Sequence, residues 1–360
     1  MRPKSILIIG NYGAGNLGDD AILGGILTDL KTLGCKGKIE VMHGGFHSSQ
    51  EIYKHVEEVP FMPAGIRSFF SKKRKKAAMD AIKRADLVIL GGGGLFTDSE
   101  TGKAPLIWAL QMYAVMRLNK PYICYGQSVG PLKSWFAKRI TKRVFKGANG
   151  VCVRDHISAA LLKKMGVENV ITGTDPAFSW LTANLASVKK RVEKEDTLLI
   201  SLRRYNKKTR AKWQAIIDGA VAFAKKKHLR PVIIAMDVRD EKELKDLRST
   251  GLEVIAPPSA NLAFQEFVKA KYAVTMRLHA GIFALAAKNP LLALSYSHKV
   301  SGLFKSLPSS GVEIIKMDHL SKGKLKRAFK KLASQKRSSL NLEKATVGNR
   351  DFLASELELR

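Results

Sequence analysis

Cysteine is scarce in this sequence, and it has no long apolar run. The three cysteines, Cys35, Cys124 and Cys152, have no C-x-x-C spacing, and the last two lie within apolar stretches. This pattern excludes a disulfide framework and a cysteine-ligated metal site. No stretch approaches the length needed to cross a bilayer, and the apolar run Ile6 to Ile9 is too short for a signal peptide. We therefore expect a cytoplasmic protein with reduced cysteines.

Acidic residues are few compared with basic ones. The 360 residues include 62 lysines and arginines but 31 acidic residues, which gives a formal net charge of +31. Basic clusters lie at residues 72–76, 225–227 and 316–337. Such clusters suit nucleic acid and anionic lipid headgroups equally, and a solvated basic face is a further explanation. The sequence has no zinc finger, aromatic RNA-binding signature or helix-turn-helix pattern, which favours an anionic membrane surface over nucleic acid as partner.

The most prominent motif is a glycine-rich stretch at residues 10–20. It follows the apolar run 6–9 and precedes apolar residues at helical spacing, so we predict a strand, a loop and a helix. In a parallel sheet such a junction lies at the carboxyl ends of the strands, where backbone amides and a helix N-terminus can hold an anion. The stretch contains G-x-G-x-x-G at residues 13–18. However, the next predicted strand runs into His43 and not into an acidic residue, which disfavours a dinucleotide.

Short apolar runs alternate with helical patterns along both halves of the chain. The predicted strands are 6–9, 38–42, 87–90, 122–125 and 151–153, followed by 197–202, 232–236, 252–256, 272–276, 291–296 and 312–317. Such alternation indicates parallel sheets covered by helices on both faces. We therefore predict an α/β fold of two Rossmann-like doubly wound domains that face a cleft, an arrangement that is glycosyltransferase-B-like (GT-B-like).

The expected domain boundaries follow the same rhythm. Residues 1–176 form the N-terminal Rossmann-like domain, and a polar and charged stretch, 177–196, is expected to be a linker. Residues 197–335 form the C-terminal Rossmann-like domain, and residues 336–360 form a tail helix.

Asp19 and Asp20 begin the first helix. An aspartate at this position caps backbone N–H groups and suits the helix dipole. One cap needs only one of the two carboxylates, so the other is left to face the cleft. A carboxylate beside an anion site can act as a general base, and we assign this role to Asp19.

Four glycines, Gly91 to Gly94, follow the predicted strand 87–90. Glycine is costly unless the backbone must approach a ligand closely or adopt positive φ, so we expect Gly92 and Gly93 to contact a ligand. A tight turn before helix packing is the alternative. Asp98, which ends this loop, is a second candidate carboxylate.

The next two strand ends carry polar side chains. Gln127 and Ser128 offer groups that bind hydroxyls, and a plain Gly-Pro turn is the competing explanation. Arg154 and Asp155 follow the strand 151–153. Arg154 is a candidate anion ligand, and a helix-capping ion pair between the two residues is the alternative.

In the second half, basic residues follow the strands. Arg203 ends the strand 197–202, Arg277 and His279 follow the strand 272–276, and Lys299 follows the strand 291–296. Arginine matches the geometry of carboxylates and phosphates, and histidine titrates near neutral pH. We therefore predict that Arg277 and His279 function together at this strand-to-helix junction.

Taken in order, these motifs resemble the polysaccharide pyruvyltransferase family over residues 5–305. The resemblance is carried by residues 10–20, 91–98, 126–131, 153–155, 175–178, 276–279 and 295–302. The Gly-Asn-x-Gly-Asp element, residues 15–19, and the Arg-Leu-His triplet, residues 277–279, are the specific parts. The sequence looks most similar to the bacterial branch that ketalises N-acetylmannosamine in lipid-linked precursors of secondary cell wall polymers.

The resemblance implies a GT-B-like enzyme that uses phosphoenolpyruvate as donor, with no nucleotide, cofactor or catalytic metal. It implies that Arg277 binds the donor and that His279 donates a proton or binds phosphate. The family's first-loop acid falls on Asp19, and Asn16 and Gly18 fall in the same element. The N-terminal domain then takes the acceptor and the C-terminal domain takes phosphoenolpyruvate.

Two departures and two alternatives accompany the resemblance. The family often has Asp-Pro-Lys where this chain has Ser297-His298-Lys299, so only Lys299 carries over, and Asp20 replaces an expected glutamate. A nucleotide-sugar-dependent glycosyltransferase of the same fold is the first alternative, and a basic nucleic-acid-binding protein is the second. A lipid-linked acceptor would place a cationic cytoplasmic enzyme at the inner face of the cell membrane, and the oligomeric state is left open.

Overall fold

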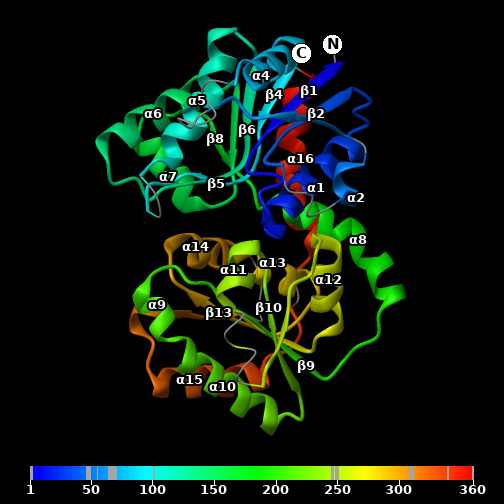
Figure 1. The fold of residues 1–360 in the computed structure, drawn as a ribbon, viewed down its shortest axis with the longest axis vertical. Helices are drawn as coiled ribbons and strands as arrows, with labels where there is room; N and C mark the ends of the chain where they lie inside the picture. Colours follow the sequence, from blue (N-terminus) through cyan, green and yellow to red (C-terminus); the bar gives the residue numbers. More distant parts are fainter. Residues whose placement is uncertain are drawn as a thin grey trace. The chain divides into compact units, whose positions relative to one another are not determined.

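The computed structural model describes residues 3–45, 50–54, 56–63, 71–99, 102–244, 247, 251–307, 312–338 and 340–358. These residues form two compact units (Figure 1). The N-terminal unit comprises the chain up to Gly15, Asp19–Trp180 and the residues from Glu343 on, and the C-terminal unit comprises Asn16–Gly18 and Leu181–Leu342. A short segment of the glycine-rich loop thus groups with the second half of the chain.

The N-terminal unit contains a parallel sheet. Its strands are β1 (Ser5–Ile9), β2 (Lys38–His43), β3 (Glu57–Pro60), β4 (Leu87–Leu90), β5 (Gly93–Phe96), β6 (Tyr122–Val129), β7 (Gly150–Val153) and β8 (Val170–Thr172). In the described residues the strand order is β3-β2-β1-β4-β6-β7-β8, and β5 pairs with β6. Strands β1 and β4 are continuous apolar runs because both faces of the sheet are covered.

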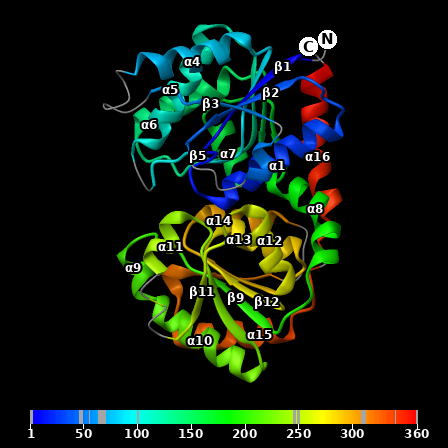
Figure 2. The same cartoon turned by 45° about the vertical axis from the view of Figure 1, so that its right-hand side comes forward.

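Helices cover both faces of this sheet (Figure 2). They are α1 (Leu17–Thr32), α2 (Gln50–Tyr53), α4 (Lys72–Arg84), α5 (Ala104–Arg117), α6 (Trp135–Lys146), α7 (His156–Lys164) and α16 (Leu342–Glu358). Helix α8 (Ala177–Arg191) belongs in part to each unit. Buried residues of α4, α5, α6 and α7 form one core with the strands. Helix α16 packs through Phe352, whose ring stacks 6.1 Å from that of Tyr125, and through Asn349, which exchanges hydrogen bonds with the backbone of Thr174.

The C-terminal unit contains a second parallel sheet, of order β11-β10-β9-β12-β13-β14 in the described residues. Its strands are β9 (Thr197–Ser201), β10 (Arg230–Ile234), β11 (Glu253–Ile255), β12 (Tyr272–Thr275), β13 (Leu291–Ser295) and β14 (Val312–Lys316). Its helices are α9 (Lys207–Ala211), α10 (Trp213–Lys226), α11 (Val238–Leu244), α12 (Ala260–Lys269), α13 (Leu278–Ala286), α14 (His298–Ser306), η2 (Met317–His319) and α15 (Lys322–Ser334). Helices α10 and α15 pack on one face, and α12 and α13 lie on the other (Figure 1).

Two parallel α/β sheets are what the alternating pattern predicted. The interval 177–196, expected to be a linker, is largely occupied by α8, whose first five residues are all buried, and the boundary between the two units falls within this helix, after Trp180. The tail helix is α16, which begins at Leu342. In the described residues, no helix is both long enough and apolar enough to span a membrane.

Candidate functional site

In the N-terminal unit, the loop after β1 is built around the buried ring of Tyr12. A Cβ at Gly10 would lie 2.4 Å from Cζ of this ring, and a Cβ at Gly91 would lie 2.0 Å from its hydroxyl oxygen. Both glycines are therefore needed for packing. Burial, together with the charges of Asp19, Asp175 and Asp20, raises the pKa of Tyr12 well above its ordinary value, so the phenol stays protonated.

Asp19 and Asp20 have different surroundings. Asp20 is fully buried, and its Oδ1 accepts hydrogen bonds from the Gly13 N–H (3.2 Å) and the Tyr53 hydroxyl (2.9 Å). It therefore holds the glycine-rich loop in place. Asp19 accepts a hydrogen bond from Nδ2 of Asn11 (2.7 Å), and its Oδ1 lies 3.6 Å from the position that a Cβ at Gly93 would take. The structure thus brings two predicted site residues, Asp19 and Gly93, together.

The run Gly91 to Gly94 has local structural reasons. A Cβ at Gly92 would lie 2.8 Å from Cγ2 of Ile22 and 3.0 Å from the Gly126 carbonyl oxygen. Gly93 adopts φ of +108°, which side chains rarely allow. Packing and backbone conformation therefore account for Gly92 and Gly93 without a ligand, and ligand contact at these positions stays a prediction.

Asp98 and Gln127 bind backbone groups. The Asp98 carboxylate accepts hydrogen bonds from the N–H groups of Lys133 (2.7 Å) and Ser134 (2.8 Å), immediately before α6. The fully buried Gln127 donates its Nε2 proton to the Gly91 carbonyl oxygen. Ser128 is buried at the end of β6. Asp98 and Gln127 thus hold neighbouring loops at the strand ends.

Arg154 forms a buried ion pair with a residue after β8. Its Nη1 lies 2.5 Å from Oδ2 of Asp175, and both side chains are almost fully buried. Asp155 instead caps α7, because its Oδ1 accepts hydrogen bonds from the N–H (2.8 Å) and hydroxyl (2.9 Å) of Ser158. The alternative of a helix-capping ion pair was therefore right about the cap, which Asp155 forms, and wrong about the ion pair, which Arg154 forms with Asp175. Asp175 follows the short strand β8. An acidic residue at this position was the signal in the sequence that could have identified the partner of Arg154.

In the C-terminal unit, Arg277 is held by two carboxylates that the sequence analysis missed. Its Nε and Nη2 donate hydrogen bonds to Asp240 (2.6 and 2.5 Å), and Nη2 also lies 3.3 Å from Oδ2 of Asp237. Asp237 accepts further hydrogen bonds from Arg239. Two aspartates directly after the apolar run 232–236 were the signal that could have found them. These contacts engage Nε and Nη2 of Arg277 and leave its Nη1 outside both carboxylate pairings.

Burial and charge act against each other in this group. Burial alone would lower the pKa of Arg277, but Asp240 and Asp237 outweigh it and raise the pKa above its ordinary value. Burial raises the pKa of Asp240, and Arg277 offsets only part of this effect. Burial also opposes ionisation of Asp237, yet hydrogen bonds from Arg239 and the charge of Arg277 leave the pKa of Asp237 below its ordinary value. Arg277 is therefore a permanent cation.

Arg203 and Arg277 follow neighbouring strands. Strand β9 pairs with β12 in the register Ser201↔Thr275, so the loops after these strands lie side by side. Tyr296 follows the next strand, β13. Its hydroxyl accepts a hydrogen bond from Nη1 of Arg203 (2.7 Å). Lys299 lies in α14, but its side chain is outside the described part of the chain.

His279, in the first turn of α13, packs against the glycine-rich segment that groups with this unit. A Cβ at Gly18 would lie 2.2 Å from Nδ1 of His279. Two interactions fix the segment: the Leu17 N–H donates to the Met236 carbonyl oxygen (3.0 Å), and Asn16 forms an antiparallel bridge with Asp237. Oδ1 of Asn16 accepts a hydrogen bond from the Gly18 N–H (3.1 Å). Three predicted site residues, Asn16, Gly18 and His279, are thus brought together.

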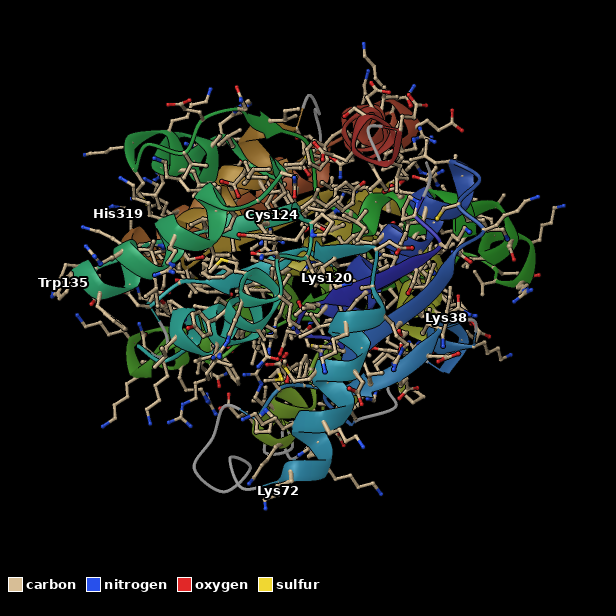
Figure 3. The ribbon with its side chains drawn as sticks, turned by 90° about the horizontal axis from the view of Figure 1, so that it is seen from above. Lys38, Lys72, Lys120, Cys124, Trp135 and His319 are labelled. Carbon is tan, nitrogen blue, oxygen red and sulfur yellow. The ribbon has the colours of Figure 1, made fainter. Side chains whose placement is uncertain are left out.

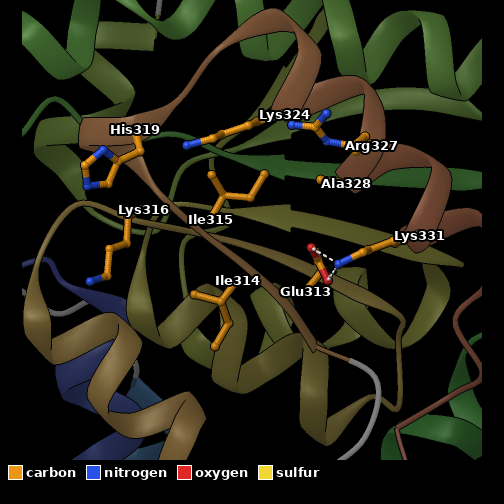
Figure 4. A pocket seen from close by; sticks show the side chains of 9 residues that line it. All are labelled: Glu313, Ile314, Ile315, Lys316, His319, Lys324, Arg327, Ala328 and Lys331. Carbon is orange, nitrogen blue, oxygen red and sulfur yellow. Dashed lines mark hydrogen bonds and ion pairs between the residues drawn. The ribbon is translucent and has the colours of Figure 1, made fainter.

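Part of the basic region 316–337 lines a pocket in the C-terminal unit. A pocket of about 350 Å³ is lined by β14, η2 and α15 (Figure 4), through Glu313, Ile314, Ile315, Lys316, His319, Lys324, Arg327, Ala328 and Lys331. Glu313 forms an ion pair with Lys331 (3.0 Å). No predicted site residue lines this pocket, so it is separate from the strand-end residues described above.

The fold places the chain in a known structural class. The UDP-GlcNAc 2-epimerase of Methanocaldococcus jannaschii, solved in complex with UDP-GlcNAc and UDP, matches with a TM-score of 0.64 and 13% identity over 99% of each chain. The UDP-GlcNAc 2-epimerase of Neisseria meningitidis matches with a TM-score of 0.62 and 12% identity, also over 99% of each chain. This likeness shows the fold alone, and it confirms the predicted GT-B-like α/β class.

The sequence also identifies the family. A family model described as polysaccharide pyruvyl transferase matches residues 16–298, so the chain belongs to the polysaccharide pyruvyl transferase family. The amylovoran biosynthesis protein AmsJ of Erwinia amylovora is 25% identical over an alignment of 368 positions, which covers 84% of this chain and 86% of that protein. The predicted family is confirmed, while the branch within it stays a prediction.

Proposed function

We propose that the protein transfers pyruvate from phosphoenolpyruvate to two hydroxyls of one sugar in a surface-polysaccharide precursor, forming a cyclic ketal and releasing phosphate. The observation that carries this proposal is the family match over residues 16–298, which contains both the loop residue Gly18 and the triplet residue His279. The packing of these two residues against each other supports a shared role.

The reaction needs one acid and one base. Protonation of the methylene carbon of phosphoenolpyruvate makes the adjacent carbon electrophilic. A sugar hydroxyl adds there and loses its proton, phosphate leaves with the C–O bonding electrons, and the second hydroxyl adds and loses its proton to close the ring. We assign the first proton transfer to His279 and the deprotonation of the attacking hydroxyl to Asp19, because carboxylates and imidazoles are efficient catalysts of such transfers.

The donor requires cations, because it carries a carboxylate and a phosphate on three carbons. We assign this contact to Arg277, Arg203, Arg154 and Lys299, since arginine binds such groups in a bidentate manner. Support comes from the two carboxylates that fix the Arg277 guanidinium and leave Nη1 outside their pairings. A guanidinium held in advance loses little entropy on binding.

We propose that the acceptor sugar contacts the strand ends of the N-terminal unit, through Gly92, Gly93, Asp98, Gln127 and Ser128. The sugar itself is proposed to be a lipid-linked N-acetylmannosamine. An acceptor anchored by a lipid would bring a cationic enzyme to the inner, anionic face of the cell membrane. Because AmsJ is named for amylovoran biosynthesis, exopolysaccharide fragments belong in any acceptor panel.

The test is phosphate release from phosphoenolpyruvate with a panel of glycan acceptors, repeated with His279→Ala and Asp19→Asn. We expect release that depends on an acceptor, and at least about a hundredfold loss in each variant. A loss below about tenfold in both would contradict the assigned roles. If uridine or guanosine sugars raise the melting temperature and phosphoenolpyruvate does not, the protein is a glycosyltransferase. Retention on heparin that ordinary salt abolishes, without donor binding, would indicate a nucleic-acid-binding protein.

A further inference from the structure

Helices α5 and α6 of the N-terminal unit expose large apolar side chains. Trp135 is 72% exposed and Tyr113 is 50% exposed, which is unusual for aromatic residues of their size. The exposed apolar set consists of Leu106, Ile107, Leu110 and Tyr113 on α5 and Trp135 and Phe136 on α6. We call these six residues the α5–α6 patch. Exposed apolar groups gathered in this way mark interaction surfaces.

The patch is the outer face of two helices whose inner faces are packed in the core. On α5 its residues recur every three to four positions, while Trp108, Met112 and Val115 turn to the sheet. The two helices pack side by side on the same face of the sheet. Both run antiparallel to the parallel strands, so their first turns lie at the same edge. The rings of Trp135 and Phe136 meet edge to face, with centroids 6.1 Å apart.

The segment that carries the patch has charge of one sign. No acidic residue occurs between Glu100 and Asp155, a stretch that includes both helices. Exposed cations surround the aromatic residues of α6, namely Lys133, Lys138, Arg139, Lys142, Arg143 and Lys146. Figure 3 shows Trp135 at the periphery, on the far side from Lys38. Exposed aromatic residues flanked by lysines and arginines are typical of helices that lie in the headgroup region of an anionic membrane.

We propose that the α5–α6 patch docks on an anionic phospholipid bilayer, with Trp135 and Phe136 entering the headgroup region and the α6 cations contacting lipid phosphates. Docking depends on the proposed function in one respect: it would bring the enzyme to a lipid-linked acceptor. The patch adjoins a predicted acceptor contact, because Asp98 accepts the Ser134 N–H one residue before Trp135.

A second surface also combines apolar and basic residues, but its shape does not suit a bilayer. The groove between α10 and α15 has an apolar floor that includes Phe223 and Phe329, with a rim of lysines, and a volume of about 870 Å³. This groove is concave, so a bilayer surface could not reach its floor, whereas Trp135 projects into solvent. Lys326 and Lys330 on the groove's rim therefore provide a matched charge control.

The experiment is sedimentation of the full chain with vesicles of phosphatidylcholine alone or of phosphatidylcholine with phosphatidylglycerol. We expect binding only to the anionic vesicles, and a loss of about tenfold or more in Trp135→Ser/Phe136→Ser. Lys138→Gln/Arg139→Gln should weaken binding, and Lys326→Gln/Lys330→Gln should bind as the natural chain does. Because Trp108, Trp180 and Trp213 are buried, a blue shift of tryptophan emission on vesicle addition should come from Trp135 and disappear in Trp135→Phe.

Several outcomes would overturn the proposal. These are equal binding to neutral vesicles, unchanged binding of the Trp135→Ser/Phe136→Ser variant, or a greater loss in the α15 control than in the α6 charge variant. A dimer in sedimentation equilibrium that this aromatic variant dissociates would show that the patch joins two copies of the chain. The variant should still release phosphate with a short soluble acceptor, so failure of docking and failure of pyruvyl transfer are separate results.

Discussion

The imidazole of His279 lies directly against the backbone of Gly18. A Cβ at Gly18 would stand 2.2 Å from Nδ1 and 2.3 Å from Cγ of this ring, a separation that real atoms do not tolerate. Residues 261 positions apart (279 − 18) in the sequence are thus fitted to each other. The close approach of the two residues within the C-terminal unit gives the glycine a structural reason.

We predict that Gly18→Ala displaces the His279 ring and lowers turnover by at least about tenfold, because general acid catalysis depends on the position of the acid. The matched control is Gly348→Ala in α16, where nothing lies within 4 Å of the added methyl group. Steady-state phosphate release measures both variants. Equal turnover of Gly18→Ala and the natural chain would contradict the role of His279.

Asp240→Asn should destabilise the C-terminal unit. Removing one partner of a buried ion pair leaves the other charge uncompensated, which costs about 3 kcal/mol. Asp237, 3.3 Å from Arg277, keeps the loss from being larger. The control is Glu266→Gln, which breaks a surface pair with Lys269 and should change the stability by less than about 0.5 kcal/mol. Urea denaturation measures both variants, and equal effects would show that the Arg277 pair contributes no more than a surface pair.

Asp29→Asn should stabilise the protein above neutral pH. Burial raises the pKa of Asp29 to about 6, and the hydrogen bond that the Tyr125 hydroxyl donates (2.7 Å) offsets part of this effect. Because the folded pKa exceeds the ordinary value of 3.8, ionisation destabilises the folded state as the pH rises from about 4 to about 6. The substitution removes this ionisation and should gain up to about 3 kcal/mol at pH 8.

Melting temperatures at pH 4 and pH 8 test this prediction. The difference between Asp29→Asn and the natural chain should be much smaller at pH 4, where the folded carboxyl is protonated and the unfolded one, with a pKa of 3.8, is only about half ionised. Asp318→Asn, which removes an exposed carboxylate from η2, is the control. A stabilisation of the same size at both pH values would show that ionisation of Asp29 is not its cause.

Two substitutions of Asp98 separate its hydrogen bonds to the backbone before α6 from its predicted contact with the acceptor. Asp98→Ala removes the acceptor of the Lys133 and Ser134 N–H groups and should cost about 1 kcal/mol of stability, whereas Asp98→Asn retains one acceptor oxygen. If Asp98 also binds a sugar hydroxyl, both variants should raise KM for the acceptor. A lowered melting temperature of Asp98→Ala with unchanged KM in both variants would limit Asp98 to holding the backbone before α6.

Much of the fold follows from local patterns. The runs 6–9 and 87–90 predicted strands because a parallel sheet covered on both faces needs continuous apolar segments. The glycine-rich loop was also predictable, because glycines between an apolar run and a helical pattern indicate a strand, a loop and a helix. The stretch 177–196 was predicted as a linker, and the boundary between the units falls within it. Its helix, α8, was not predicted, because the buried residues 177–181 are consecutive and show no helical spacing.

The site was predicted less completely because its partners are distant in the sequence. Arg277 and Arg154 were singled out correctly as residues of the strand ends, but their carboxylates, Asp240 and Asp175, lie 37 and 21 residues away. No local spacing links such pairs. The meeting of Arg277 with Asp240 depends on a strand order in which β10 pairs with β9 and β9 pairs with β12, and that of Arg154 with Asp175 depends on the pairing of β7 with β8. Sheet topology was not specified by the alternating pattern.

The most direct test of pyruvyl transfer is the mass of the acceptor. The protein is incubated with carbon-13-labelled phosphoenolpyruvate and a short lipid-linked N-acetylmannosaminyl acceptor, and the glycan is analysed by mass spectrometry. We predict a product heavier than the acceptor by one labelled pyruvate minus one water, formed together with one phosphate and absent with His279→Ala. Release of phosphate with an acceptor of unchanged mass, or transfer of a sugar from a nucleotide in place of pyruvate, would contradict the account.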